Sequence, residues 1–241
     1  MHADIVVPAL ALRAVSGHLD EQAIAKYARR AASTWVDCFI LSGTTTQGQS
    51  LSTAERAVVL DLWLDLTPAT RLLACCWSAG DMVNALHRGI APIVVMRDLS
   101  DRAAASSFLH SLPAGAYVYS HPAHSRIVLD AQLCADAREA GFLPVGAKVA
   151  KVTHSDIRSI RDQTGPDFTL WDASSRNIRA SVAAGASGVI ATPLSPFASP
   201  FPSRGVDSVQ GVVDRVQADL DRMASRDARS AYLAGRAAAA L

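Results

Sequence analysis

The chain has 241 residues, of which 50% are hydrophobic and 19% are charged, with 14 Gly and 11 Pro. This length allows one large α/β domain or two small ones, and the composition excludes a disordered chain, a collagen-like chain and a disulfide-stapled miniprotein. The 23 basic and 22 acidic side chains nearly cancel, and the longest basic run is Arg29-Arg30. We therefore do not expect nucleic acid as the main partner.

Two further classes are disfavoured by the sequence. No uncharged apolar run reaches the roughly 18 residues that a membrane-spanning helix needs. The chain begins with His2 and Asp4 in place of a basic segment, so no signal peptide is predicted. The four cysteines lack the spacing of metal ligands and are interpreted as buried free thiols. We expect a cytoplasmic protein without a membrane partner.

Short apolar runs alternate with longer stretches of helical periodicity along the whole chain. The expected strands are Ile5–Leu12, Cys38–Leu41, Leu72–Trp77, Ile93–Met96, Ala116–Tyr119, Leu143–Ala150, Phe168–Trp171 and Gly188–Ala191. The expected helices are Asp20–Thr34, Ser52–Leu66, Gly80–Arg88, Asp101–Leu112, Arg126–Ala140, Ser155–Thr164, Arg176–Ala184 and Val206–Met223. Strands that alternate with helices predict a parallel sheet.

Eight such units are the number that closes a barrel. The competing architecture, a doubly wound open sheet, would carry a glycine fingerprint after its first strand, and none is present. We predict an α/β protein with one (β/α)8 TIM barrel over residues 1–225 and a short C-terminal helical tail over residues 226–241.

In such barrels the functional site lies where the strands end. Gly43-Thr44-Thr45-Thr46-Gln47-Gly48 follows the second strand, and its hydroxyl and backbone N–H groups could hold a small anion such as a carboxylate. An ordinary threonine-rich loop with local hydrogen bonds is the alternative. The fifth strand ends in Tyr119, whose phenol could relay protons or could be a core aromatic, and His121 and His124 follow in the next loop.

Lys148 lies in the middle of the uncharged sixth strand. Its neighbours on the same face, Gly146 and Ala150, are small, which predicts room for a ligand beside the amine. A desolvated lysine amine can attack carbonyls and form a Schiff base. The alternatives are a lysine that points outward between the helices or one paired with a carboxylate, such as Asp172 at the end of the seventh strand.

Taken in this order, these residues resemble the dihydrodipicolinate synthase/N-acetylneuraminate lyase family of Schiff-base aldolases. The resemblance extends from about Ile5 to Pro200. Four segments carry it: Gly43-Thr44-Thr45 with Leu51-Ser52 and Glu55, Tyr119 to Pro122, Gly146-Ala147-Lys148, and Gly185-Ala186-Ser187-Gly188-Val189-Ile190.

The resemblance implies a (β/α)8 barrel whose Lys148 condenses with the keto group of pyruvate or another 2-oxo acid. Tyr119 would be the proton-relay phenol, and Thr44 and Thr45 would hold the carboxylate, with Thr45 also passing protons. The backbone of Gly146 and Ile190 would line the same pocket. No metal and no cofactor are implied, and the partners would be a small 2-oxo acid and an aldehyde.

The sequence also departs from the family pattern. Where the family usually has Gly-Thr-Thr-Gly-Glu, this chain has Gly43-Thr44-Thr45-Thr46-Gln47. Val149 stands where the family usually has a glutamate after the lysine. The arginine that would bind the carboxylate of a second substrate is replaced by His124, which we include among the substrate-binding residues. The segment Met96–Leu99 lacks the tyrosine that, in the family, reaches into a neighbouring subunit. Most of the family's helical C-terminal extension is also absent. Dihydrodipicolinate synthase activity itself is therefore not expected, and a homo-oligomer is left open.

Three functional hypotheses remain. The first is a lyase, a compact class I aldolase that acts on pyruvate or a related 2-oxo acid with an unidentified aldehyde. The second is a non-catalytic or regulatory barrel that binds a small carboxylate. The third is a metal-assisted aldolase that uses His121 and His124. A chelator would inactivate the third, whereas borohydride would inactivate the first.

Overall fold

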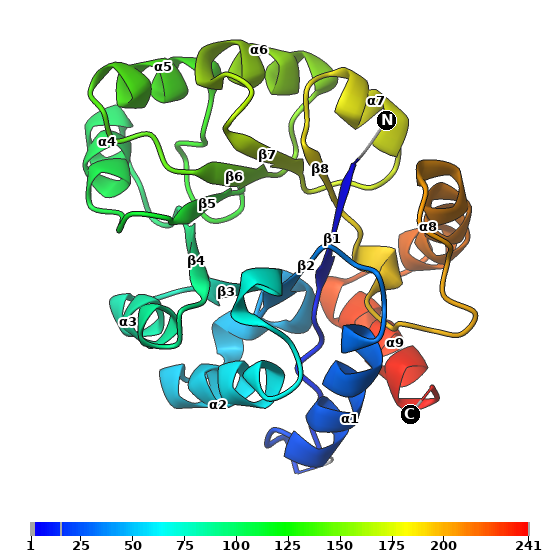
Figure 1. Ribbon diagram of the computed structural model, residues 1–241. Coiled ribbons are helices and arrows are strands. Elements are labelled where there is room, and N and C mark those ends of the chain that lie inside the picture. Colours follow the sequence, from blue (N-terminus) through cyan, green and yellow to red (C-terminus); the bar gives the residue numbers. More distant parts are fainter. Residues whose placement is uncertain (1–2, 15, 241) are drawn as a thin grey trace. The chain divides into compact units, whose positions relative to one another are not determined.

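The structure is a computed structural model that describes residues 3–14 and 16–240. Its eight strands form a closed parallel barrel in the order of the sequence, so the predicted (β/α)8 fold is confirmed. Strands and helices alternate along the chain (Figure 1). The strands are β1 (Asp4–Pro8), β2 (Cys38–Leu41), β3 (Leu72–Cys76), β4 (Ala91–Val95), β5 (Tyr117–Ser120), β6 (Gly146–Val149), β7 (Thr169–Asp172) and β8 (Gly188–Ile190).

With one exception, the helices begin and end close to the predicted positions. They are α1 (Glu21–Ala32), α2 (Thr53–Leu64), α3 (Ala79–His87), α4 (Arg102–His110), α5 (Ala131–Glu139), α6 (His154–Thr164), α7 (Ile178–Ala183), α8 (Val206–Asp221) and α9 (Arg226–Ala238). Short 3-10 helices are η1 (Thr44–Thr46), η2 (Gly48–Ser50), η3 (Ala69–Arg71) and η4 (Thr192–Leu194). The predicted capping box of α2 is present, with Ser52 and Glu55 each bonded to the other's backbone N–H.

The differences from the predicted elements lie at their ends. The strand predicted over Leu143–Ala150 is only four residues long, and Pro144 in its first part has no N–H for a strand ladder. The helix predicted from Arg126 begins at Ala131, because Asp130 caps it by accepting a hydrogen bond from Leu133 N at 2.8 Å. Residues 121–130 therefore form a longer loop after β5 than the sequence indicated.

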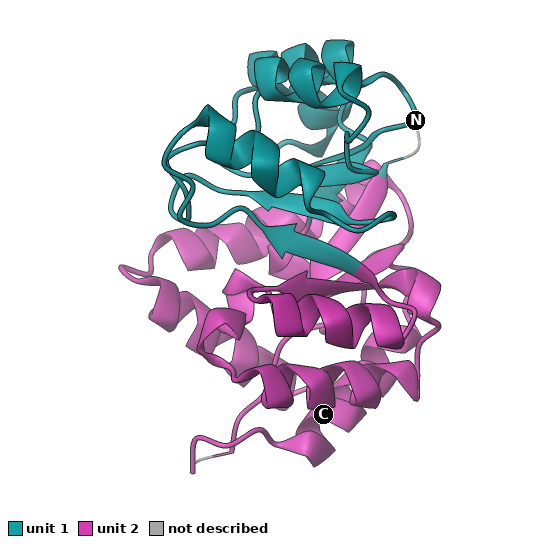
Figure 2. Ribbon diagram, turned by 90° about the vertical axis from the view of Figure 1, so that its left-hand side faces the viewer, with its two compact units in different colours: residues 1, 3, 92–190 teal, residues 2, 4–91, 191–241 magenta. Residues whose placement is uncertain are grey.

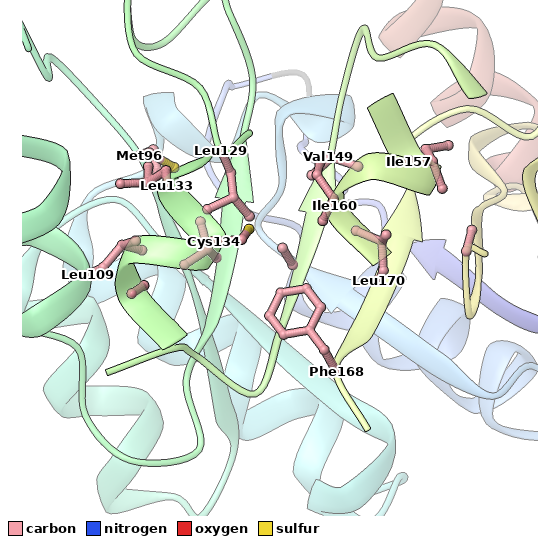
Figure 3. Close-up of a cluster of buried hydrophobic side chains, with 14 of the residues drawn as sticks. Met96, Leu109, Leu129, Leu133, Cys134, Val149, Ile157, Ile160, Phe168 and Leu170 are labelled. Carbon is pink, nitrogen blue, oxygen red and sulfur yellow. The ribbon is translucent and has the colours of Figure 1, made fainter. Parts of the chain in front are cut away.

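The chain divides into two compact units, coloured separately in Figure 2. The first comprises Ala3 and residues 92–190, with β5 to β8 and α4 to α7. One face of its strands packs on its helices. There Val149 and Leu170 lie in one apolar cluster with Ile157, Ile160 and others (Figure 3). This packing sets the direction of every second side chain along β6 and β7.

Among the described residues, the second unit comprises 4–91 and 191–240. Its strands β1, β2 and β3 are in parallel register, and aromatic side chains form much of its core. The ring centroids of Phe39 and Trp63 lie 5.0 Å apart, and those of Tyr27 and Phe197 lie 5.4 Å apart. The Tyr27 hydroxyl donates to Ser195 O at 2.6 Å, and burial raises the pKa of this phenol.

None of the helices in the described part of the chain is long and apolar enough to cross a membrane.

Candidate active site

Lys148 lies on the face of β6 that is turned away from the helices. Its strand neighbours Ala147 and Val149 both belong to the apolar cluster on the helical side, so alternation places Lys148 on the opposite face. The register aligns Lys148 with Tyr119 on β5 and with Trp171 on β7. The interpretation that Lys148 points outward between the helices is thereby wrong.

The amine of Lys148 is held by an aromatic ring. Nζ lies 3.8 Å from the centroid of the Tyr119 ring, and only 5% of the Lys148 surface is exposed. A cation at this distance above a phenol ring is attracted by the negative face of the ring. Within residues 92–190, all of which the structure describes, no carboxylate pairs with this amine. Lys148 and Tyr119, both predicted site residues, are thus brought together.

Beside Lys148, the same face of the strands is filled by side chains. The rings of Tyr117 and Trp171 stack with centroids 5.0 Å apart and an interplanar angle of 18°. A Cβ added at Gly146 would lie 2.4 Å from Thr169 O and 2.9 Å from Tyr117 Cδ1. The small size of Gly146 therefore serves close packing, and the expectation that it leaves room for a ligand is wrong. Gly146 stays a predicted substrate contact through its backbone alone.

Asp172 is not the partner of Lys148. Its carboxylate accepts hydrogen bonds from Ser181 Oγ at 2.6 Å and from Ser174 N at 2.8 Å. Asp172 is aligned with Val149, whose side chain packs on the helical side of the sheet, and it faces α7. Burial raises the pKa of this carboxyl above its ordinary value of 3.8, whereas a nearby ammonium would lower it. The salt-bridge alternative for Lys148 is thus wrong for this carboxylate.

Two histidines from the loop after β5 complete a cluster around Tyr119. The Tyr119 ring meets the ring of His124 edge-on at 5.9 Å and that of His121 at 6.1 Å, and the two imidazoles lie 5.2 Å apart. His121 Nδ1 accepts a hydrogen bond from Ala123 N at 2.9 Å, which places the proton of the neutral imidazole on Nε2. No group of three or more potential metal ligands occurs among the described residues.

The loop after β4 fixes the position of His124. Asp98 N donates to His124 O at 2.9 Å, and Ser125 Oγ donates to Leu99 O at 3.3 Å. The half-buried imidazole is thereby held beside Tyr119, at the end of the strand. The predicted substrate residue Ile190 is the last residue of β8 and is buried.

Thr44 and Thr45 belong to the second unit and form η1 directly after β2. Thr44 is buried and Thr45 is half-buried. The turn closes through a hydrogen bond from Gly48 N to Gly43 O at 2.9 Å. Gly48 is required here, since a Cβ at this position would lie 1.7 Å from Ser42 O.

A buried arginine supports this turn, and the sequence analysis did not identify it. Arg56 Nε donates to Asp81 Oδ1 at 2.8 Å, and Nη1 donates to the carbonyls of Gly48, at 2.9 Å, and Leu51. Trp77 N and Ser78 N both donate to Asp81 Oδ2 at 2.9 Å. Trp171 was not predicted as a neighbour of Lys148 either. Its position two residues after Thr169 places both on one face of β7, and this alternation could have indicated that Trp171 lies beside Lys148.

These observations define a class of protein: a (β/α)8 barrel with a buried lysine on the face of its sixth strand turned away from the helices. No profile of a known protein family matches the sequence, and no curated protein matches it. Solved structures do match. A protein assigned to the dihydrodipicolinate synthase family from Coccidioides immitis has a TM-score of 0.79 and 18% identity, over 98% of this chain and 84% of that one.

Two aldolases have similar structures. One is the sialic acid aldolase of Ruminococcus gnavus, solved as a mutant of its catalytic lysine, with a TM-score of 0.71 and 14% identity over 80% of this chain and 68% of that one. The other is a variant of the 2-keto-3-deoxygluconate aldolase of Sulfolobus solfataricus in a pyruvate complex. Its TM-score is 0.67 and its identity 15%, over 90% of this chain and 76% of that one. The resemblance drawn from the motifs is thus confirmed at the level of the fold.

Proposed function

We propose that the protein is a lyase, a class I aldolase of the dihydrodipicolinate synthase/N-acetylneuraminate lyase family, which acts on pyruvate or a related 2-oxo acid. The observation that carries the proposal is the state of Lys148. Its amine is buried against the Tyr119 ring, and no carboxylate of its own unit neutralises it. Burying an amine without a carboxylate partner is costly, which favours a functional role for this side chain.

The chemistry of such a lysine is nucleophilic. Nζ, as the neutral amine, adds to the keto carbon of the 2-oxo acid, and water leaves to form an iminium. In the cleavage direction the bound 2-oxo acid carries a hydroxyl on C4, and this hydroxyl gives up its proton to a base. The C3–C4 bond then breaks, its electron pair moves into the iminium to form an enamine, and the C4 fragment leaves as an aldehyde. Protonation of the enamine at C3 and hydrolysis then release the 2-oxo acid and the free amine. The condensation direction is the reverse.

The neighbouring residues fit supporting roles in these steps. The phenol of Tyr119 would carry protons to and from the reacting oxygen, and its ring keeps the amine at the end of the strand. Thr44 and Thr45 would hold the carboxylate, and Thr45 would also pass protons. His124 would contact the second substrate from the loop after β5. Two similar structures support the choice of a lysine as the reacting residue and of pyruvate as the substrate, since one was solved as a catalytic-lysine mutant and the other in complex with pyruvate.

The test is intact-mass analysis after incubation with pyruvate and sodium borohydride. Reduction of the iminium should add the mass of one pyruvic acid less one oxygen atom to each chain. Lys26, Lys148 and Lys151 are the only lysines, so digestion and mass spectrometry locate the adduct without ambiguity. We expect it on Lys148, and we expect Lys148→Ala to abolish it.

Lys151→Arg is the matched control, because it changes a nearby exposed lysine and should leave the adduct intact. No adduct with pyruvate or with longer 2-oxo acids would overturn the aldolase proposal. If calorimetry still showed carboxylate binding, the non-catalytic barrel would replace it. Loss of activity to a chelator without borohydride sensitivity would favour the metal-assisted alternative.

A further inference from the structure

The C-terminal helix contacts the predicted carboxylate-binding turn directly. Ser230 Oγ on α9 donates a hydrogen bond to Thr45 O at 2.8 Å. A second bond runs in the opposite direction, from Gln47 Nε2 to Asp227 Oδ1 at 2.9 Å. Both bonds join residues that are more than 170 positions apart in the sequence and lie within the second unit. The tail is therefore part of the surroundings of the turn.

Gln47 is one of the positions where the sequence departs from the family pattern. It has a left-handed backbone, with φ of 54°, and it ends η1 by donating its N–H to Thr44 O at 3.2 Å. A non-glycine residue in this conformation is uncommon and needs support from its surroundings. The bond to Asp227 supplies such support.

The helix that makes these contacts is itself anchored. Leu233 and Ala237 are buried. The Tyr232 hydroxyl donates to Asp219 Oδ2 on α8 at 2.6 Å, and Arg236 Nη1 donates to that hydroxyl at 3.1 Å. Arg30 on α1 donates to Ala240 O beyond the other end of α9. A helix fixed at several points along its length can hold a short turn in place.

On its other side, the segment after the turn is held by Arg56, which donates to the carbonyls of Gly48 and Leu51. The hydrogen bond from Ser230 fixes the plane of the peptide that joins Thr45 to Thr46, because this peptide is rigid and planar. The bond therefore restricts the ψ angle of Thr45 and the φ angle of Thr46, and with them the shape of the turn. A carboxylate bound by hydroxyl and N–H groups needs donors that are oriented before it arrives.

We propose that α9 orients the Thr44–Thr46 turn to bind the carboxylate of the 2-oxo acid, with Ser230 and Asp227 as positioning residues. This inference rests on the function proposed above and deepens it. The helix acts through the turn and would not touch the reacting atoms. It follows that loss of these contacts should weaken the recognition of the carboxylate and leave the reactivity of Lys148 intact.

The test compares two ketones in the borohydride trapping assay. Pyruvate carries the carboxylate, and acetone has a methyl group in its place. For Ser230→Ala, we expect the half-saturating concentration of pyruvate to rise about five-fold, the factor for the loss of one hydrogen bond. The trapping rate at saturation and the response to acetone should not change. Ser230→Thr keeps the hydroxyl and should restore the wild-type value.

Asp227→Ala should act in the same direction as Ser230→Ala. Its matched control is Asp214→Ala, which removes an aspartate that accepts a hydrogen bond from Gln210 of its own helix, away from the turn. Circular dichroism and thermal melting of every variant should show the same folded fraction as the wild type at the assay temperature.

Each outcome decides between the proposals. An equal loss with pyruvate and acetone, or no loss at all, would overturn the role of α9. If the wild type forms no adduct yet binds pyruvate by calorimetry, the Schiff base fails, and the effect of Ser230→Ala on that binding then decides the role of α9. A wild type that neither traps nor binds pyruvate overturns both.

Discussion

Two basic side chains in the described part of the chain, Arg56 and Lys148, are buried in contrasting ways. Arg56 in the second unit is 8% exposed and forms an ion pair with Asp81 at 2.8 Å, while its remaining N–H groups bind Gly48 O, Leu51 O and the Thr53 hydroxyl. Lys148 in the first unit is 5% exposed and rests on the ring of Tyr119, with no carboxylate of that unit beside it.

This difference separates a structural charge from a chemical one. A guanidinium has a planar fork of donors that never deprotonates in proteins, so Arg56 serves as a permanent clamp on the turn after β2. A lysine amine can lose its proton and attack a carbonyl when no carboxylate holds it as an ammonium. We therefore expect changes around Arg56 to affect folding, and changes at Lys148 to affect chemistry.

The largest expected effect comes from removing the partner of Arg56. Asp81→Ala leaves the guanidinium buried without its counter-ion, and the N–H groups of Trp77 and Ser78 lose their acceptor. Breaking a buried pair in this way costs about 3–5 kcal/mol, so the free energy of unfolding should fall by that amount in urea titrations.

Asp61→Ala is the control for this prediction. Asp61 pairs with Arg88 at 2.6 Å, but its side chain is 59% exposed. Surface pairs contribute about 0–1 kcal/mol, so this variant should be almost as stable as the wild type. Equal costs for Asp81→Ala and Asp61→Ala would show that the buried clamp contributes no more than a surface pair.

Replacing each of the two buried basic side chains with methionine should affect stability unequally. Lys148→Met replaces the amine with an apolar side chain of similar length that can still contact the Tyr119 ring. No carboxylate of the unit is left unpaired, so the free energy of unfolding should change by less than about 1.5 kcal/mol, the usual range for a volume-conserving change. Arg56→Met strands Asp81 and should cost about 3–5 kcal/mol. Similar urea midpoints for the two variants would contradict the distinction.

The burial of Lys148 and its position beside Tyr119 could be predicted from the sequence, whereas the burial of Arg56 could not. Lys148 stands out in the sequence because it interrupts a short apolar strand, and strand alternation then places it beside Tyr119. Arg56 lies on α2, and an arginine on a helix is ordinary and most often exposed. Its burial depends on Asp81, which is 25 positions away and follows another strand. Local periodicity carries no information about such a pairing.

Contacts between distant parts of the chain also explain why the space expected at Gly146 is absent and why the contact of α9 with Thr45 was not predicted. A glycine beside Lys148 suggested space, but the residues on the adjacent strands decide whether space exists, and Thr169 and Tyr117 occupy it. The tail after Arg226 is recognisable as a helix by its composition. Its contact with Thr45 arises from the way the chain folds back, which a single sequence does not encode in any local pattern.

The smallest expected effect tests whether Lys148 truly lacks the nearest candidate partner on β7. Burial raises the pKa of Asp172 in the folded state, so the folded protein holds this proton to higher pH than the unfolded chain does. Stability from this group is therefore present below its ordinary pKa of 3.8 and is lost as the pH rises through the raised value.

The variant Asp172→Asn has no proton to lose at this position. The free energy of unfolding of the wild type relative to this variant should thus fall with rising pH in that window and stay flat at neutral pH. A carboxylate paired with Lys148 would have a lowered pKa and the opposite slope, so a relative stability that rises with pH would place Asp172 beside the amine after all.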